Sequence, residues 1–202
     1  MLFRSAAAAA KTAQALKEHR DELLADPMSP VVGDPEGKVT VVEFFDYNCP
    51  YCRAAGPMMT ELLQKKPDVR IVYKEFPTLA PSSRFAAQAA LAARRRSPEL
   101  YAVFHDALLK ANGRLAEDGV VQIAREAGVD VDRMRADMED PAIGQSIDKN
   151  IELARAIGVT GTPTFIIGDA MLVGAKPLQQ IESAIADARP PPSPPSVPTP
   201  AR

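Results

Sequence analysis

The feature that most constrains the fold is a strand–helix–strand pattern early in the chain. Val39–Phe45, with the sequence VTVVEFF, is a β-prone and almost continuously apolar run, which is typical of a strand buried on both faces of a sheet. A helix is predicted from Pro50 to about Lys66, because proline is well tolerated in the first helical turn, and Val69–Phe76 is predicted as the next strand. A β-α-β crossover is right-handed and its strands are parallel. The sequence therefore predicts a sheet that contains a parallel pair.

The rest of the chain separates into a helical block and a second sheet-forming unit. Residues 81–157 show helical patterns throughout. Thr164–Ile167 and Met171–Val173 then predict a β-hairpin, and a last helix is predicted from Pro177 to about Ala188. This order predicts an α/β fold in which a β-α-β unit and a β-β-α unit form one central mixed sheet. The helices between them form an all-helical insertion.

The two ends of the chain differ from its middle. Residues 6–26 predict a helix with a thin, alanine-rich apolar stripe, which either docks on the body or pairs with a copy of itself. Residues 26–37, rich in proline and glycine, predict a connector. We therefore expect an N-terminal part at 1–37 that could form a homo-oligomer, a main domain at 38–188, and a disordered proline-rich tail at 189–202.

Charge and hydropathy exclude two classes of partner or location. The chain has 24 Lys and Arg against 26 Asp and Glu, a net charge of −2, so nothing favours nucleic-acid binding. No window approaches the ~18 apolar residues of a membrane span. Arg4 and the alanines after it resemble a signal peptide, but they lack a leucine-rich core. We expect any signal peptide to be absent from this chain or truncated.

Both cysteines of the chain lie in one stretch, FDYNCPYCR, at Cys49 and Cys52. A structural zinc site needs four ligands, and the two histidines, His19 and His105, fall in separate predicted helices, so no metal site is predicted. A disulfide used only as a staple is also disfavoured, because a loop this small removes little entropy from the unfolded chain. The remaining interpretation is a reversible redox pair.

The redox interpretation has a physical mechanism. Cys49 is predicted at the N-cap of the helix, where its thiolate can accept backbone N–H groups, including that of Cys52, and lies at the positive end of the helix dipole. Both effects lower the pKa of Cys49 and make it reactive. Cys52 lies one turn further and is expected to be the buried, resolving thiol. No cofactor is expected beyond the Cys49–Cys52 disulfide.

Glu43 is the one charged residue in the apolar strand Val39–Phe45. A lone buried charge is costly unless it is functional or paired. One interpretation is therefore a carboxylate bonded to Lys74 or another neighbour. The other is a buried carboxyl group whose pKa is raised by desolvation, as proton transfer near neutral pH requires.

The stretch VVEFFDYNCPYCR, together with GVTGTPTF more than a hundred residues later, resembles the thioredoxin superfamily. More narrowly it resembles the disulfide-bond-forming DsbA-like branch, whose thioredoxin fold contains a helical insertion. The resemblance covers about residues 38–188. It implies that Cys49 is the exposed nucleophile, that Cys52 resolves the mixed disulfide, and that Glu43 relays the proton of Cys52.

The same resemblance assigns a role to the second motif. Thr162-Pro163 matches a loop whose proline is cis and faces the disulfide. Backbone groups around it, at Gly161 and Thr162, are expected to pair with a substrate peptide as an added strand. Pro50 and Tyr51, between the cysteines, are expected to tune the redox potential. Because strongly oxidising members carry a histidine at the position of Tyr51, we expect a less extreme oxidant here.

The resemblance implies a thiol–disulfide oxidoreductase of the bacterial periplasm, either an oxidase or an isomerase. The absence of any cysteine beyond the pair fits such a compartment. Its expected partners are cysteine-containing protein substrates and a membrane thiol-redox protein. The threonine directly before the proline, Thr162, resembles the residue found there in dimeric isomerases and in oligomeric, metal-stress-linked relatives. Those relatives carry an N-terminal helical segment. The alternative hypothesis is a self-associating, chaperone-like binding module in which redox activity is secondary.

Overall fold

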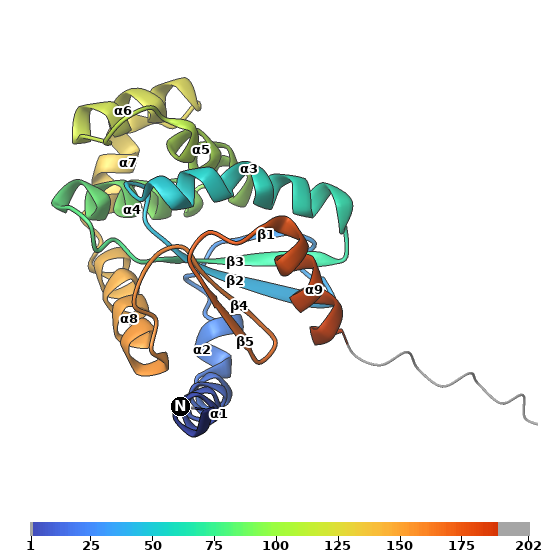
Figure 1. Cartoon of the computed structure of the whole chain (residues 1–202). Helices are drawn as coiled ribbons and strands as arrows, with labels where there is room; N and C mark the ends of the chain where they lie inside the picture. The colour runs from blue at the N-terminus through green and yellow to red at the C-terminus, as the bar shows by residue number, and fades with distance from the viewer. Residues whose placement is uncertain (1, 190–202) are drawn as a thin grey trace, which may run out of the picture.

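A five-stranded mixed sheet forms the centre of the computed structural model, which describes residues 2–189 (Figure 1). The strand order is β1-β3-β2-β4-β5; β2 and β3 are parallel, and every other neighbouring pair is antiparallel. The predicted β-α-β and β-β-α units and their single mixed sheet are therefore confirmed. The strand bounds are Val31–Gly33 for β1, Val39–Phe45 for β2, Val69–Glu75 for β3, Thr164–Ile167 for β4 and Ala170–Val173 for β5.

Strand β1 was not predicted, because residues 26–37 were expected to be only a connector. Val31 pairs with Val72 of β3, and the Tyr73 N–H donates to Pro30 O at 2.9 Å. The strand is too short to show an alternating pattern. It ends at Gly33, whose φ is 97°, and a Cβ there would lie 2.7 Å from Val69 O. Only glycine fits this close approach of two backbones.

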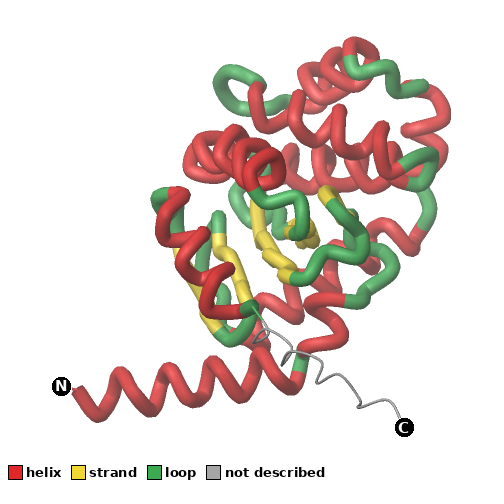
Figure 2. The backbone as a smooth tube through the Cα atoms, turned by 90° about the vertical axis from the view of Figure 1, so that its right-hand side faces the viewer, coloured by secondary structure: helices red, strands yellow, loops and turns green. Residues whose placement is uncertain are grey.

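The N-terminal helix differs from the single helix expected at residues 6–26. Helix α1 spans Leu2–Glu18 and α2 spans Arg20–Leu24, so the helix is interrupted at His19. Leu16 and Leu23 are each only 3% exposed and belong to the core under the sheet. Docking on the body is therefore confirmed for this end of the segment. The rest of α1 extends away from the body (Figure 2), and its pairing with a second copy stays a prediction.

Helices α4 to α8 form the predicted insertion between β3 and β4. Several begin as the sequence indicates: Ser97 accepts the Leu100 N–H at 2.9 Å, and Asp140 accepts the Ala142 N–H at 2.8 Å. The remaining bounds are Pro50–Lys65 for α3, Pro81–Arg94 for α4, Pro98–Lys110 for α5, Glu117–Glu126 for α6, Val131–Met138 for α7, Pro141–Ile157 for α8 and Leu178–Ala188 for α9. Apart from Arg189, the predicted tail lies outside the described residues.

The two faces of the sheet are covered by different helices, as Figure 1 shows. Val42 and Phe44 of β2 pack in the core that also contains residues of α8 and of the N-terminal helices. Val41 and Phe45 pack in the larger core with α3, α9 and the insertion. Because side chains alternate along a strand, Glu43 lies on the same face as Val41 and Phe45. This places its carboxyl group on the side of the sheet that α3 covers.

Lys74 on β3 is paired in register with Phe44 and is only 1% exposed. Its ammonium group donates to Ser29 Oγ at 2.7 Å, to Glu22 O at 2.6 Å and to Asp26 Oδ2 at 3.3 Å. These bonds hold α2 and the following connector against the sheet. Lys74 is therefore not the partner of Glu43 that one interpretation of the sequence suggested, because the two side chains leave opposite faces of the sheet.

Candidate active site

Cys49 and Cys52 lie at the start of α3, which follows β2 after a short loop. Cys49 is the N-cap of α3 with extended backbone angles, φ −80° and ψ 118°, and both cysteines are free thiols. Cys52 is fully buried, as predicted. Cys49, however, is only 4% exposed and is not the exposed thiol that the resemblance implied. The reason is that its Sγ faces the Thr162 loop, where the protonated thiol donates a hydrogen bond to Thr162 O at 3.2 Å.

The surroundings of the two thiols separate their pKa values. The pKa of Cys49 falls from 9.0 to about 5, chiefly because the Cys52 thiol donates to its sulfur, with Thr162 and the N–H groups of Cys52 and Tyr51 contributing further. Burial opposes this shift and does not cancel it. Burial, followed by the bond to Cys49, raises the pKa of Cys52 far above its usual value. At neutral pH the pair is thus one thiolate and one thiol.

Glu43 is 3% exposed and interacts electrostatically with both cysteines. Burial, and secondly the negative charge of Cys49, raises the pKa of Glu43 from 4.5 to about 8. A carboxyl group in this position is mostly protonated at pH 7 and can exchange that proton with a nearby thiol.

The Thr162-Pro163 peptide bond is cis, as predicted. Two carbonyls of this loop are used within the protein: Gly161 O accepts from Thr164 Oγ1 at 2.7 Å, and Pro163 O accepts from the Gly174 N–H at 2.8 Å. The carbonyl of Thr162 points instead at Cys49. The loop therefore presents Thr162 to whatever molecule approaches the sulfur of Cys49.

Two polar residues between β2 and Cys49 fix the active-site loop. Asp46 is 1% exposed and accepts the N–H groups of Thr78 and Leu79 at 2.9 and 3.0 Å. Asn48 accepts the Leu115 N–H at 2.8 Å and donates to the serine hydroxyls at the start of α4. Those hydroxyls do not cap α4, which begins at Pro81. Asx residues directly after a strand indicate a turn, but these distant partners leave no signal in the sequence.

Arg53 ties the same loop to the helical insertion. Its Nε donates to Tyr47 O at 2.8 Å, and its Nη1 donates to Ala111 O at 3.2 Å and to Gly113 O. The guanidinium group is also attracted to the negative charge of Cys49. No signal in the sequence singles out Arg53, because a basic residue in the first turns of a helix is ordinarily a solvent-exposed side chain.

A buried polar network lies behind the loop. Tyr47 Oη is 2.9 Å and Tyr101 Oη 3.2 Å from His105 Nδ1, and both hydroxyls also approach Glu75 Oε1, at 3.3 and 3.5 Å. Burial lowers the pKa of His105 to about 3, so its ring is neutral at pH 7. The network anchors Tyr47 two residues before Cys49. Only the four-residue spacing of Tyr101 and His105 on one helix face indicates it in the sequence.

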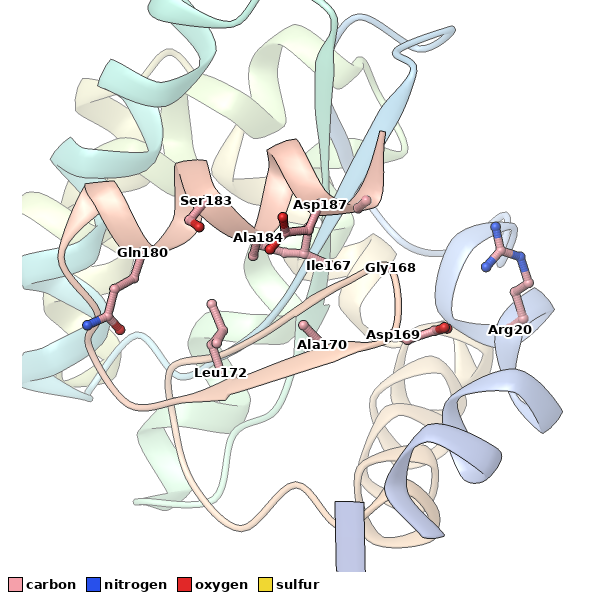
Figure 3. A pocket seen from close by; sticks show the side chains of 11 residues that line it. Arg20, Ile167, Gly168, Asp169, Ala170, Leu172, Gln180, Ser183, Ala184 and Asp187 are labelled. Atoms are coloured by element: carbon pink, nitrogen blue, oxygen red, sulfur yellow. The ribbon is translucent and has the colours of Figure 1, made fainter. Parts of the chain in front are cut away.

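A separate hollow of about 740 Å³ lies between α9 and the β4–β5 hairpin. Figure 3 shows Gln180, Ser183 and Asp187 along one face of α9, with Leu172 on the opposite side. The hollow is lined by neither cysteine and by no residue of the Thr162 loop. It is therefore not part of the candidate site.

Over the described residues, no helix combines the length and the apolar character that crossing a membrane requires.

A low-pKa thiolate at a helix N-terminus, a buried second thiol and a facing cis-proline together define a thioredoxin-like redox site. Comparison with known proteins identifies the branch. Residues 40–186 match the family described as the DSBA-like thioredoxin domain. The chain belongs to this family, and the thioredoxin fold with a helical insertion is thereby confirmed.

Several known proteins are similar to the chain. A thioredoxin-like oxidoreductase of Silicibacter pomeroyi superposes with a TM-score of 0.81 at 47% identity, over 84% of this chain and 96% of that one. The thiol:disulfide interchange protein DsbA of Bordetella parapertussis is 28% identical over 69% of this chain and 68% of its own. The Na(+)/H(+) antiporter NhaA 3 of Salinispora tropica is 32% identical over 93% of this chain. The chain spans only 30% of that antiporter's length.

Proposed function

We propose that the protein is a thiol–disulfide oxidoreductase that exchanges disulfides with cysteine-containing proteins through Cys49 and Cys52. The observation that carries this proposal is the placement of the two thiols: Cys49 is the N-cap of α3 and faces the Thr162 loop, and Cys52 is fully buried. This placement lowers the pKa of Cys49 and raises that of Cys52. A stable thiolate is both a good nucleophile at neutral pH and a good leaving group. The names of the DsbA and thioredoxin-like relatives support the same chemistry.

The proposed oxidation of a substrate dithiol has two steps. In the first, a substrate thiolate attacks Cys49 Sγ, the Cys49–Cys52 bond breaks, and Cys52 leaves and takes up a proton. In the second, the other substrate thiolate attacks the substrate sulfur of the mixed disulfide, and Cys49 leaves as a thiolate. Two electrons pass from the substrate to the protein, and one proton is released to solvent. Run in reverse, the same steps reduce or isomerise a disulfide.

Glu43 is proposed to supply the proton that Cys52 takes up. Its carboxyl group is buried on the α3 side of the sheet, has a pKa of about 8, and interacts with Cys52. Cys52 is fully buried, so its sulfur cannot take this proton directly from solvent. Thr162 is proposed to hold the substrate backbone beside Cys49, since its carbonyl already faces that sulfur.

The proposed location and partners rest on the resemblance to the DsbA-like family. We place the protein in the bacterial periplasm, where disulfides persist and where a membrane thiol-redox protein would restore its oxidation state. Antiport activity belongs to the whole Salinispora protein and is not carried over to this chain. The chaperone-like alternative and oligomer formation through residues 6–26 stay predictions. Leu16 and Leu23 of that segment already pack within the same chain.

The proposal is tested by titrating the thiolate absorbance of the reduced protein against pH. We expect one sulfur to ionise with a midpoint near 5, because hydrogen bonds from Cys52, Thr162 and the helix N–H groups stabilise the Cys49 thiolate. The Cys49→Ser variant, as control, should show no ionisation below pH 9. A midpoint above 8 in the unsubstituted protein would exclude the proposed mechanism.

A further inference from the structure

A groove of about 880 Å³ begins at the two residues that flank Cys49 and follows α3 away from them. Four residues of α3 form one wall: Pro50, Arg53, Ala54 and Pro57. Their spacing of three, four and seven residues puts them on a single face of the helix. The buried face of α3 is a different one, formed by Cys52, Ala55, Met59 and Leu62.

The opposite wall comes from the helical insertion. Leu109 and Lys110, at the end of α5, and the loop that follows it line this side, and α5 packs beside α3. The lining also includes Leu79, which is 53% exposed. The groove thus lies in the junction between the thioredoxin-like part and the insertion. None of its lining residues belongs to the Thr162 loop.

The mouth of this groove is directly next to the chemistry. Asn48 and Pro50, the two chain neighbours of Cys49, both line it. Consecutive Cα atoms are about 3.8 Å apart, so the groove reaches the backbone on both sides of Cys49. A substrate segment joined to Cys49 through its own cysteine can therefore extend into this groove.

The charge of the groove has one sign. Arg53, Lys110 and Arg114 are its charged lining residues, and no carboxylate lines it among the residues that the structure describes. Lys110 is paired with Asp106 at 2.5 Å, outside the lining. Arg114 is exposed and makes no ion pair within residues 2–189. The groove therefore carries a local excess of cations although the net charge of the chain is −2.

We propose that the groove is a specificity subsite for acidic side chains of the substrate segment that flanks the reacting cysteine. The inference rests on the proposed function and names the substrate class that this site favours. The apolar lining residues accommodate the segment, and the exposed Lys110 and Arg114 select carboxylates. Such rim charges act mainly on the association rate and its salt dependence.

The test uses three dithiol peptides of equal length that differ only in the residues flanking the cysteines: three aspartates, three serines or three lysines. The full-length protein is first oxidised with oxidised glutathione. Its second-order rate of reduction by each peptide is then followed by acid quenching and mass analysis. We expect the aspartate peptide to react about tenfold faster than the lysine peptide at low salt. The ratio should fall to roughly twofold or less at about 0.5 M salt.

The variants locate the effect. Replacing Lys110 and Arg114 together with glutamine should reduce the aspartate-to-lysine rate ratio to roughly threefold or less and leave the serine peptide unaffected within about twofold. The matched control replaces Lys149 and Arg133, which do not line the groove, and changes the net charge equally. It should preserve the ratio.

The outcomes also separate this inference from the proposed function. Equal rates for the three peptides, or equal losses in the two double variants, would overturn the acidic subsite while leaving the redox function intact. If no peptide reduces the Cys49–Cys52 disulfide, the proposed function itself fails.

Discussion

Replacing Cys52 with alanine is expected to trap covalent complexes, and replacing Cys49 with serine is expected to abolish exchange. The Cys49 thiolate attacks a substrate disulfide, the substrate bond breaks, and a mixed disulfide forms. Without Cys52 nothing within the protein resolves it, so the complex accumulates. In the Cys49→Ser variant the remaining thiol is fully buried, and its pKa is raised far above the usual value. The rate should therefore fall by roughly a thousandfold or more, because only the thiolate is nucleophilic.

The measurement is mass spectrometry of each reduced variant after incubation with a peptide disulfide. One peptide adduct per protein molecule is expected for Cys52→Ala and none for Cys49→Ser. The opposite pattern would show that the two cysteine roles are reversed. Adducts with neither variant would mean that the sulfurs are not accessible to substrate at all.

Replacing Glu43 with glutamine is expected to stabilise the protein while slowing its chemistry. The pKa of Glu43 is raised to about 8 in the folded state, against 4.5 in the unfolded chain, so ionisation favours unfolding. Below pH 4.5 the carboxyl group does not destabilise the folded state. Between pH 4.5 and pH 8 the destabilisation grows as the pH rises. At pH 7 the difference corresponds to about 3 kcal/mol. Glutamine has nearly the same shape and removes this cost.

The free energy of unfolding in urea, measured at pH 4 and pH 7, tests this directly. The gain from Glu43→Gln should be near zero at pH 4 and about 3 kcal/mol at pH 7. It should be smaller in the oxidised protein, where Cys49 carries no charge. Exchange rates should fall by roughly tenfold to a hundredfold, since a positioned proton donor is lost. The exposed Glu36→Gln serves as control. A gain that does not depend on pH would mean that Glu43 is already ionised in the folded protein.

The strands and helices with strong patterns could be predicted from the sequence. Val39–Phe45 reads as a buried strand because its residues are apolar on both faces, and Pro50 marks the helix start through its fixed φ and missing N–H. Strand β1 was missed because three residues carry no periodicity. The break at His19 was missed because its helical pattern continues across it.

The candidate site was predictable only where its signal was local or carried by a known motif. The Cys49–Cys52 spacing and its place at a helix start indicate a thiolate. The cis bond at Thr162-Pro163 was predicted because this motif resembles the cis-proline loop of the DsbA-like family. The burial of Cys49 was not predictable, because it depends on a carbonyl 113 residues away. For the same reason the contacts of Asn48 and Arg53 with the insertion could not be foreseen. Their partners come together only in the folded chain.

The reactivity of the pair follows from which form the fold stabilises. Lowering the pKa of Cys49 from 9.0 to about 5 stabilises the reduced, thiolate form. At pH 7 this amounts to about 2.7 kcal/mol, or roughly 60 mV of potential for a two-electron couple. Tyr51, unlike a histidine in the same position, adds no positive charge. We therefore expect an oxidant of intermediate strength.

Equilibration of the full-length protein with glutathione buffers of graded composition at pH 7 tests the central claim most directly. The fraction of reduced Cys49 and Cys52 is measured after acid quenching. A reversible two-electron transition is predicted, with a potential between roughly −230 and −120 mV, because the stabilised Cys49 thiolate makes the disulfide easy to reduce. A pair that remains oxidised in reducing buffer, with a potential below about −300 mV, would be a structural disulfide and would contradict the account.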